Sequence, residues 1–436
     1  MIFEPQFETM PREKLDALQL ERLQRIVAYL RERVPLYRER LDGIPEIRSL
    51  EDLRSFPFTR KADLRDTYPF GLFAVPRQEC VRLHASSGTT GKPIVVAYTR
   101  DDVDLFARVN ARVLAMAGGE PGMVLHNAYG YGLFTGGLGL HYGGELLGLT
   151  VVPVSGGMTE RQLALIEDLR PDVISCTPSY ALTLAQAFTE RGVTPDEISL
   201  RFACVGAEPW TDSMRAEIDA GLGIRATNIY GLSEIIGPGV SNECIEARDG
   251  SHVNEDHFLP EIVDPESGEP LPDGEQGVLV VTTLTKQALP LLRYWTGDVT
   301  SLSREPCSCG RTLVRMALIA GRTDDMLIVR GVNVYPTQVE SVLLRVPELT
   351  PHYRLVVTRE RTLDEVEFEV EVDETYFRSL GGELDSAAVR PLAVRVETLI
   401  RETIGTSMNV TLLAPGGGPR SEGGKLARVD DRRRLA

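Results

Sequence analysis

The chain has 436 residues, of which 42% are hydrophobic and 25% are charged, and its formal net charge at pH 7 is −16. This is the composition of a globular protein, and a chain of this length is expected to divide into at least two domains. The acidic balance argues against general nucleic-acid binding. No apolar run reaches about 18 residues, which argues against membrane insertion. The sequence also lacks the pattern of a secretory leader, which favours a cytoplasmic location.

The first 75 residues are predicted to form a helical segment. Between Leu23 and Val34, apolar residues recur at spacings of three and four, which places them on one face of a helix. Arginine and glutamate fill the opposite face, as in a helix that packs on a core. The same segment is the candidate surface for a homodimer.

Residues 76–323 are predicted to form an α/β core. Up to about residue 240, short apolar runs such as Phe202–Val205 end in small residues and alternate with helical patterns. This alternation predicts ligands at the carboxyl ends of the strands. From about residue 250 to 320, turn residues become frequent and Gly277–Thr283 is a predicted strand, so this part is expected to be β-rich.

Residues 324–436 are predicted to form a separate α+β domain. The expected elements are a strand at Met326–Val329, a helix from Pro336, a strand around Val366–Val372, a helix at 387–404 and a strand at 408–413. Their order resembles a βαββαβ unit. The expected fold class is therefore α/β, with a large N-terminal domain and a small, mobile C-terminal lid domain.

The strongest local signal is a loop rich in glycine and hydroxyl groups. Its residues are Ser86, Ser87, Gly88, Thr89, Thr90, Gly91 and Lys92. Small residues let the backbone approach a polyphosphate, hydroxyl and N–H groups donate to its oxygens, and the lysine supplies positive charge. The loop is not a Walker loop, because Ser86 and Pro93 stand where that pattern requires glycine and Ser or Thr.

Further segments resemble motifs of the adenylate-forming enzymes, which include acyl-CoA synthetases, luciferases and peptide-synthetase adenylation domains. In the superfamily's order, these segments are Tyr230–Glu234, Tyr294–Asp298, Gly321–Asp325 and Ser421–Lys425. Within the superfamily, the chain resembles the phenylacetate-CoA ligase family through Asn127–Gly137, Pro153–Gly157, Gly206–Trp210 and Arg330–Pro336.

The resemblance implies a reaction in two halves. The carboxylate of an acid attacks the α-phosphate of ATP, which gives an acyl-adenylate and pyrophosphate, and the thiol of coenzyme A then displaces AMP. The implied ligands are ATP, Mg²⁺, coenzyme A and an aryl or arylacetic acid. One alternative is transfer of the acyl group to a carrier-protein thiol, an alcohol or an amine. A silent nucleotide sensor is disfavoured, because Lys425 and Glu234 are both present.

The resemblance also implies roles for particular residues. Lys425 would be the catalytic cation that reaches the carboxylate and the phosphate, although two glycines precede it where the family usually has one. Glu234 would act with it by holding Mg²⁺, and Asp324 would be the hinge of the C-terminal domain. Tyr230 would lie against adenine, and Asp298 would bind the ribose. Besides the glycine-rich loop, the nucleotide-binding residues would be Gly206, Ala207, Glu208, Pro209, Tyr230, Gly231, Ser233, Asp298 and Arg322.

A pocket for the acyl group is predicted from five residues. The alternative is that these residues belong to the ordinary core. Tyr131 and Phe134 are expected to wall an aromatic ring, with Ile236 and Pro238 opposite. Leu140 stands where phenylacetate ligases more often have a small residue. The pocket is therefore expected to be shorter, which favours a smaller or differently substituted aryl acid over phenylacetate.

Cysteine spacing predicts a structural zinc site. Six cysteines in this length do not make a disulfide framework. Cys307 and Cys309 would join Cys244 and His252 of the preceding β-rich segment in a closed Cys₃His set. His257 is the substitute ligand if His252 points away, and the alternative is unrelated buried thiols with a surface histidine.

Overall fold

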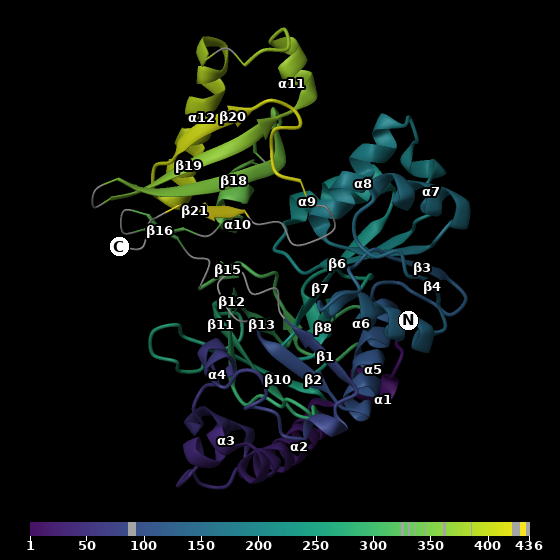
Figure 1. Ribbon diagram of the computed structural model, residues 1–436, viewed down its shortest axis with the longest axis vertical. Helices are drawn as coiled ribbons and strands as arrows, with labels where there is room; N and C mark the ends of the chain where they lie inside the picture. Colours follow the sequence, from purple (N-terminus) through teal and green to yellow (C-terminus); the bar gives the residue numbers. More distant parts are fainter. Residues whose placement is uncertain are drawn as a thin grey trace.

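The computed structural model describes residues 1–85, 93–323, 327–329, 332–334, 336–343, 345–360, 363–384, 386–420 and 428–432. The glycine-rich loop at 86–92, the hinge residue Asp324 and the catalytic candidate Lys425 lie outside the described residues. Figure 1 shows a smaller C-terminal part at the upper left and a large N-terminal part over the rest of the view, each of mixed α and β structure, which confirms the predicted fold class. Among the described residues, no helix is long and apolar enough to span a bilayer.

The N-terminal segment is helical, as its periodicity predicts. Its elements are α1 (Pro5–Glu8), α2 (Arg12–Arg33), α3 (Pro35–Arg40), η1 (Leu50–Ser55), α4 (Lys61–Asp66) and η2 (Arg77–Glu79). The apolar face of α2 is buried inside the chain, where Leu23 and Leu30 share a core with Phe258 and Leu291 of the β-rich part. That face therefore packs on this chain's own core, and a homodimer remains a prediction.

A nine-stranded sheet forms the centre of the large part. Its strand order is β13-β14-β9-β8-β7-β6-β5-β3-β4. The parallel strands are β3 (Val124–Asn127), β4 (Thr150–Val152), β5 (Val173–Cys176), β6 (Phe202–Gly206) and β7 (Arg225–Leu232). The antiparallel extension is β8 (Gly237–Glu243), β9 (Ser251–Val253), β13 (Leu302–Ser303) and β14 (Arg315–Met316). The associated helices are α5 (Arg100–Met116), α6 (Gly136–Leu147), α7 (Thr159–Leu169), α8 (Pro178–Glu190) and α9 (Asp212–Leu222), with η3 (Pro195–Glu197).

Two smaller sheets complete the large part and position the site. The antiparallel sheet β10-β11-β12-β15 is made of β10 (Phe258–Val263), β11 (Gly277–Thr283), β12 (Tyr294–Thr300) and β15 (Gly321–Arg322). The strand predicted at Gly277–Thr283 is β11, so that prediction is confirmed. A hairpin of β1 (Arg82–Ala85) and β2 (Val95–Tyr98) flanks the glycine-rich loop in sequence.

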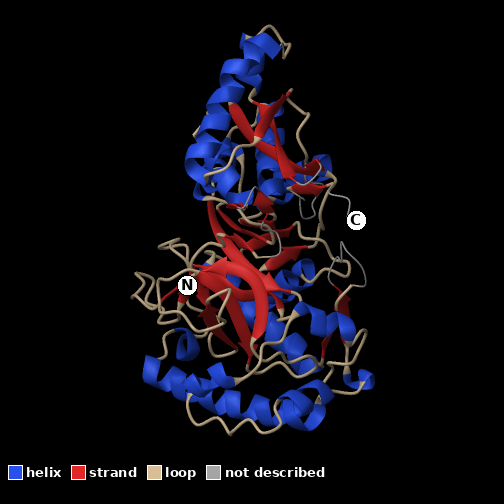
Figure 2. Cartoon of the chain, turned by 90° about the vertical axis from the view of Figure 1, so that its left-hand side faces the viewer, coloured by secondary structure: helices blue, strands red, loops and turns tan. Residues whose placement is uncertain are grey.

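The C-terminal part has its own core. Its elements are β16 (Leu327–Val329), β17 (Val332–Val334), α10 (Pro336–Leu343), β18 (Leu349–Glu360), β19 (Leu363–Val372), α11 (Glu374–Ser379), α12 (Ser386–Ile404), β20 (Asn409–Leu413) and β21 (Val429–Asp431). Alternate residues Val366, Phe368 and Val370 of β19 are buried, which is the pattern that the sequence predicted. Figure 2 shows strands through the middle of the molecule and helices towards both of its ends.

Buried ion pairs tie the N-terminal segment to the large part. Arg112 on α5 is fully buried, and its guanidinium donates to Glu4 at 2.5 Å and to the two carboxylate oxygens of Asp256 at 2.7 and 3.0 Å. Arg311 donates to Glu8 at 2.7 Å, and both side chains are buried. These pairs fasten the first turns of the chain to residues that are distant in sequence.

Replacing Arg112 by Met is expected to lower the free energy of unfolding by about 3 kcal/mol or more, because Glu4 and Asp256 would lose their shared buried partner. Urea unfolding followed by circular dichroism measures this change. The control is Arg25→Met on α2. It breaks only an exposed pair with Glu21 of that helix and is expected to cost less than about 1 kcal/mol. A loss of equal size in both variants would contradict the structural role given to Arg112.

Candidate active site

The predicted nucleotide residues of the Gly206 and Tyr230 motifs lie where β6 and β7 end, and glycine is required at both strands. A Cβ on Gly206 would lie 2.1 Å from the carbonyl oxygen of Ile229, and one on Gly231 would lie 1.9 Å from that of Gly237. Ala207 has a φ of 72°, an uncommon conformation for a residue with a side chain. Such local strain is typical of functional loops at strand ends.

The side chain of Glu208 fixes the next turn. Its carboxylate accepts a hydrogen bond at 2.7 Å from the backbone N–H of Ser179, at the N-terminal end of α8. A negative charge is favourable there, because the first N–H groups of a helix are unpaired. Trp210 anchors the other end of the turn by donating to Asn228 at 2.6 Å, while Pro209 is exposed between them.

Tyr230, Asp298 and Arg322 come together although they are far apart in sequence. The hydroxyl of Tyr230 donates to Oδ2 of Asp298 at 2.5 Å, and Nη1 of Arg322 pairs with Oδ1. The pairing of β12 with β15 places Asp298 directly opposite Arg322. Burial and the neighbouring Asp298 charge raise the pKa of Tyr230 well above its usual value, so the phenol stays protonated as a donor.

The turn between β7 and β8 carries Ser233 and Glu234. Glu234 is 6% exposed, and the Ser233 hydroxyl is 3.4 Å from that of Thr135. The ammonium of Lys286 donates to the carbonyl oxygen of Glu234 at 3.2 Å, and burial lowers the lysine pKa to about 8. Sequence analysis missed Lys286, because its only signal is a lysine between two apolar segments.

The residues assigned to the acyl pocket lie on and around α6. The hydroxyl of Tyr131 accepts from Asn127 at 2.7 Å and lies 3.1 Å from Nδ1 of His141. A Cβ on Gly139 would be 2.9 Å from Pro238, so Pro238 packs directly on the helix. The lining of this pocket remains a prediction.

Two other residues of that predicted pocket are fully buried. Leu140 belongs to a core cluster with Leu125 and Tyr129, against which Phe134 also packs. Ile236 belongs to another cluster with Tyr98, whose hydroxyl donates to the Ile236 carbonyl at 2.9 Å.

The four predicted zinc ligands form one cluster. The ligand atoms of Cys244, His252, Cys307 and Cys309 all lie within 4.8 Å of one another. Nδ1 of His252 lies 3.3 Å from the carbonyl oxygen of Leu313. If Nδ1 carries the proton and donates to this oxygen, Nε2 is the ring nitrogen left to bind a metal. The substitute His257 is not in the cluster, since its ring nitrogens contact Thr285 and Asp256.

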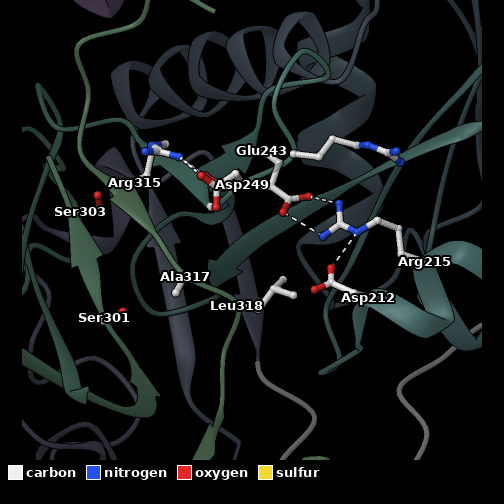
Figure 3. Close-up of a pocket in the computed structure, with 11 residues that line it drawn as sticks. Asp212, Arg215, Glu243, Asp249, Ser301, Ser303, Arg315, Ala317 and Leu318 are labelled. Atoms are coloured by element: carbon white, nitrogen blue, oxygen red, sulfur yellow. Dashed lines mark hydrogen bonds and ion pairs between the residues drawn. The ribbon is translucent and has the colours of Figure 1, made fainter. Parts of the chain in front are cut away.

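A polar cavity of about 350 Å³ lies elsewhere on the large part (Figure 3). Its residues are Asp212, Arg215, Glu243, Arg248, Asp249, Gly250, Ser301, Ser303, Arg315, Ala317 and Leu318. Each of its three arginines is paired with a carboxylate, that of Glu243, Asp219 or Asp249. Its lining includes none of the predicted site residues that fall within the described ranges, such as Tyr230, Glu234 and Asp298.

Comparison with known proteins identifies the family. The model of the AMP-binding enzyme matches residues 69–285, and that of the AMP-binding enzyme C-terminal domain matches residues 331–433. The phenylacetate-coenzyme A ligase of Thermus thermophilus is 65% identical over the full length of both chains. That of Escherichia coli is 49% identical, over 98% of this chain and 97% of the other.

A 2-hydroxyisobutyryl-CoA ligase of known structure has the same fold. In its postadenylation state with 2-HIB-AMP it is 29% identical and gives a TM-score of 0.91, covering 98% of this chain and 92% of that chain. With the same coverage, its thioesterification state with CoA gives a TM-score of only 0.72. The two parts of this chain are therefore arranged more nearly as in the postadenylation state. The motifs and these relatives agree: the chain belongs to the AMP-binding enzyme family and, within it, to the phenylacetate-CoA ligase-like acid–thiol ligases.

Proposed function

We propose that this chain joins an aryl or arylacetic acid to coenzyme A in an ATP-dependent, AMP-forming reaction through an acyl-adenylate. The observation that carries this proposal is the 65% identity, over both full lengths, to a phenylacetate-coenzyme A ligase. Leu140 packs in a core cluster with Leu125 and Tyr129, so its size is not by itself a reason to exclude phenylacetate.

In the adenylation step, an oxygen of the substrate carboxylate attacks the α-phosphorus of ATP and pyrophosphate leaves. Two anions meet, so positive charge is required where they react, and Lys425 is the residue that we assign to supply it. Tyr230 would lie on the adenine, opposite the Gly206–Glu208 turn. Asp298, already held by Tyr230 and Arg322, would receive the ribose hydroxyls.

Glu234 is our candidate Mg²⁺ ligand. It offers carboxylate oxygens, which this hard cation prefers, and it lies on the turn that joins the nucleotide motif to the predicted acyl pocket. When bound, Mg²⁺ would neutralise phosphate charge. The protein's own part is to hold the Glu234 side chain in place, and this residue is only 6% exposed.

For the second step, we propose that the C-terminal domain turns about Asp324, removing Lys425 and admitting the thiol of coenzyme A. The sulfur attacks the acyl carbon and AMP leaves. The two states solved for the 2-hydroxyisobutyryl-CoA ligase support this proposal, because this chain fits them with TM-scores of 0.91 and 0.72.

We also propose that the Cys₃His cluster holds a structural zinc ion. Zn–S bonds of about 2.3 Å at tetrahedral angles place neighbouring ligand atoms roughly 3.4–3.8 Å apart. Sγ of Cys244 lies 3.6 Å from Sγ of Cys307, and Sγ of Cys309 lies 3.4 Å from Nε2 of His252. Four protein ligands would leave no open coordination position on the ion. Its role would be to hold the segment around Cys307 against β9.

A panel of aryl, arylacetic and short aliphatic acids, each supplied with ATP, Mg²⁺ and coenzyme A, tests the proposed function. We expect AMP release with arylacetic or aryl acids. We also expect that repeated turnover requires coenzyme A. Parallel reactions with a pantetheinylated carrier protein, an alcohol and an amine test the other acceptors. AMP release that continues only with one of these acceptors would contradict the assignment of coenzyme A.

A further inference from the structure

Lys286 is a buried cation that forms no ion pair within the described part of the chain. The residue is 1% exposed. Its ammonium donates to the backbone carbonyl of Glu234 at 3.2 Å and lies 4.9 Å from the ring centroid of Tyr98. An ammonium that leaves water without a carboxylate partner costs folding free energy, so an arginine–carboxylate or apolar pair would suit a purely structural position better.

The neighbouring backbone holds Lys286 rigidly. The N–H groups of Gln287 and Ala288 donate to the two carboxylate oxygens of Asp102 at 2.7 and 2.8 Å. Asp102 also accepts from the N–H of Thr99 at the start of α5. Because its oxygens serve these backbone groups, Asp102 fixes the segment that carries Lys286 and leaves the ammonium directed to Glu234.

Lys286 and Tyr98 together hold both sides of one turn. Lys286 donates to the carbonyl of Glu234, and the hydroxyl of Tyr98 donates to the carbonyl of Ile236 at 2.9 Å. This turn joins β7, which carries the nucleotide motif, to β8, which begins beside the predicted acyl pocket. The two donors therefore set the position of Glu234 between the two halves of the proposed site.

We infer that Lys286 is a positioning residue for adenylation, whose ammonium fixes the Glu234 turn and adds positive charge beneath it. This inference rests on the proposed function, in which Glu234 serves the step that brings carboxylate and phosphate together. A fixed positive charge that is itself shielded from water, as Lys286 is, stabilises developing negative charge without reorganisation. The second step, attack of a thiol on an acyl-adenylate, has no such need for the same group.

The test is Lys286→Met, which keeps an unbranched side chain only one atom shorter and removes its charge and donors. The matched control is Lys14→Met, at an exposed position of α2. ATP–pyrophosphate exchange reports adenylation, and thioester formation from a supplied acyl-adenylate reports the second step. We expect the kcat of exchange to fall about 10²-fold, with the KM for the acid and the second step each within about 3-fold of the wild type.

Equal loss in both half-reactions, or a raised KM with kcat unchanged, would overturn the inference. If Lys286→Met does not fold, Lys286→Ala is assayed with and without added ethylammonium, which should restore exchange at least about 10-fold where the same concentration of KCl does not. Absence of exchange in the wild type counts against the proposed function, whereas normal exchange in both Lys286 variants counts against this inference alone.

Discussion

Replacing Lys425 by Ala is expected to lower ATP–pyrophosphate exchange by about 10³-fold, because the carboxylate and the α-phosphate would then meet without a cation between them. Thioester formation from a supplied acyl-adenylate is expected to stay within about 3-fold of the wild type, because Lys425 is assigned to the first step alone. An ATP–pyrophosphate exchange assay measures the first effect, and a single-turnover assay with supplied acyl-adenylate measures the second.

The control for this variant is Lys14→Ala, since that lysine lies on the exposed face of α2. Both of its half-reactions should match the wild type. Equal loss of adenylation and thioester formation in Lys425→Ala would show a general defect and would contradict the role assigned to Lys425.

Loss of zinc is expected to be the largest effect on stability. Metal analysis of the wild type should find one zinc ion per chain, and Cys309→Ser should lose it. The melting temperature should then fall by roughly 10 °C or more, because binding energy at a structural zinc site is folding energy. Calorimetry with and without a chelator measures this fall.

The matched control is Cys80→Ser, since Cys80 is partly exposed and lies outside the cluster. It should keep its zinc and its melting temperature. A wild-type protein purified without chelators that contains no zinc, or a Cys309→Ser variant as stable as Cys80→Ser, would contradict the proposed metal site.

Sequence motifs predicted the family because each one places a required chemical group at a fixed spacing. They could not show how Asp298 is held. Its partners Tyr230 and Arg322 reach it through the β12–β15 pairing and the neighbouring sheet, and that register is a property of the folded chain. His252, the histidine predicted first, lies in the cluster, where β9 pairs with β14, and the substitute His257 does not.

Burial is another property that the sequence does not supply. Leu140 remains a predicted pocket residue, and its motif does not show that α6 packs it in a buried cluster with Leu125. The burial of Lys286 has no signal in a single sequence, because nothing there shows that a lysine is enclosed. Packing decides which face of a helix or strand a residue occupies relative to a distant strand. Local periodicity in the sequence does not predict this.

The central claim is tested most directly by mass spectrometry of a single reaction that contains the purified chain, ATP, Mg²⁺, coenzyme A and phenylacetate. The account predicts AMP, pyrophosphate and phenylacetyl-CoA in equal amounts, and phenylacetyl-adenylate bound to the enzyme when coenzyme A is left out. ADP and phosphate in place of AMP, or a thioester that forms without an adenylate, would contradict it.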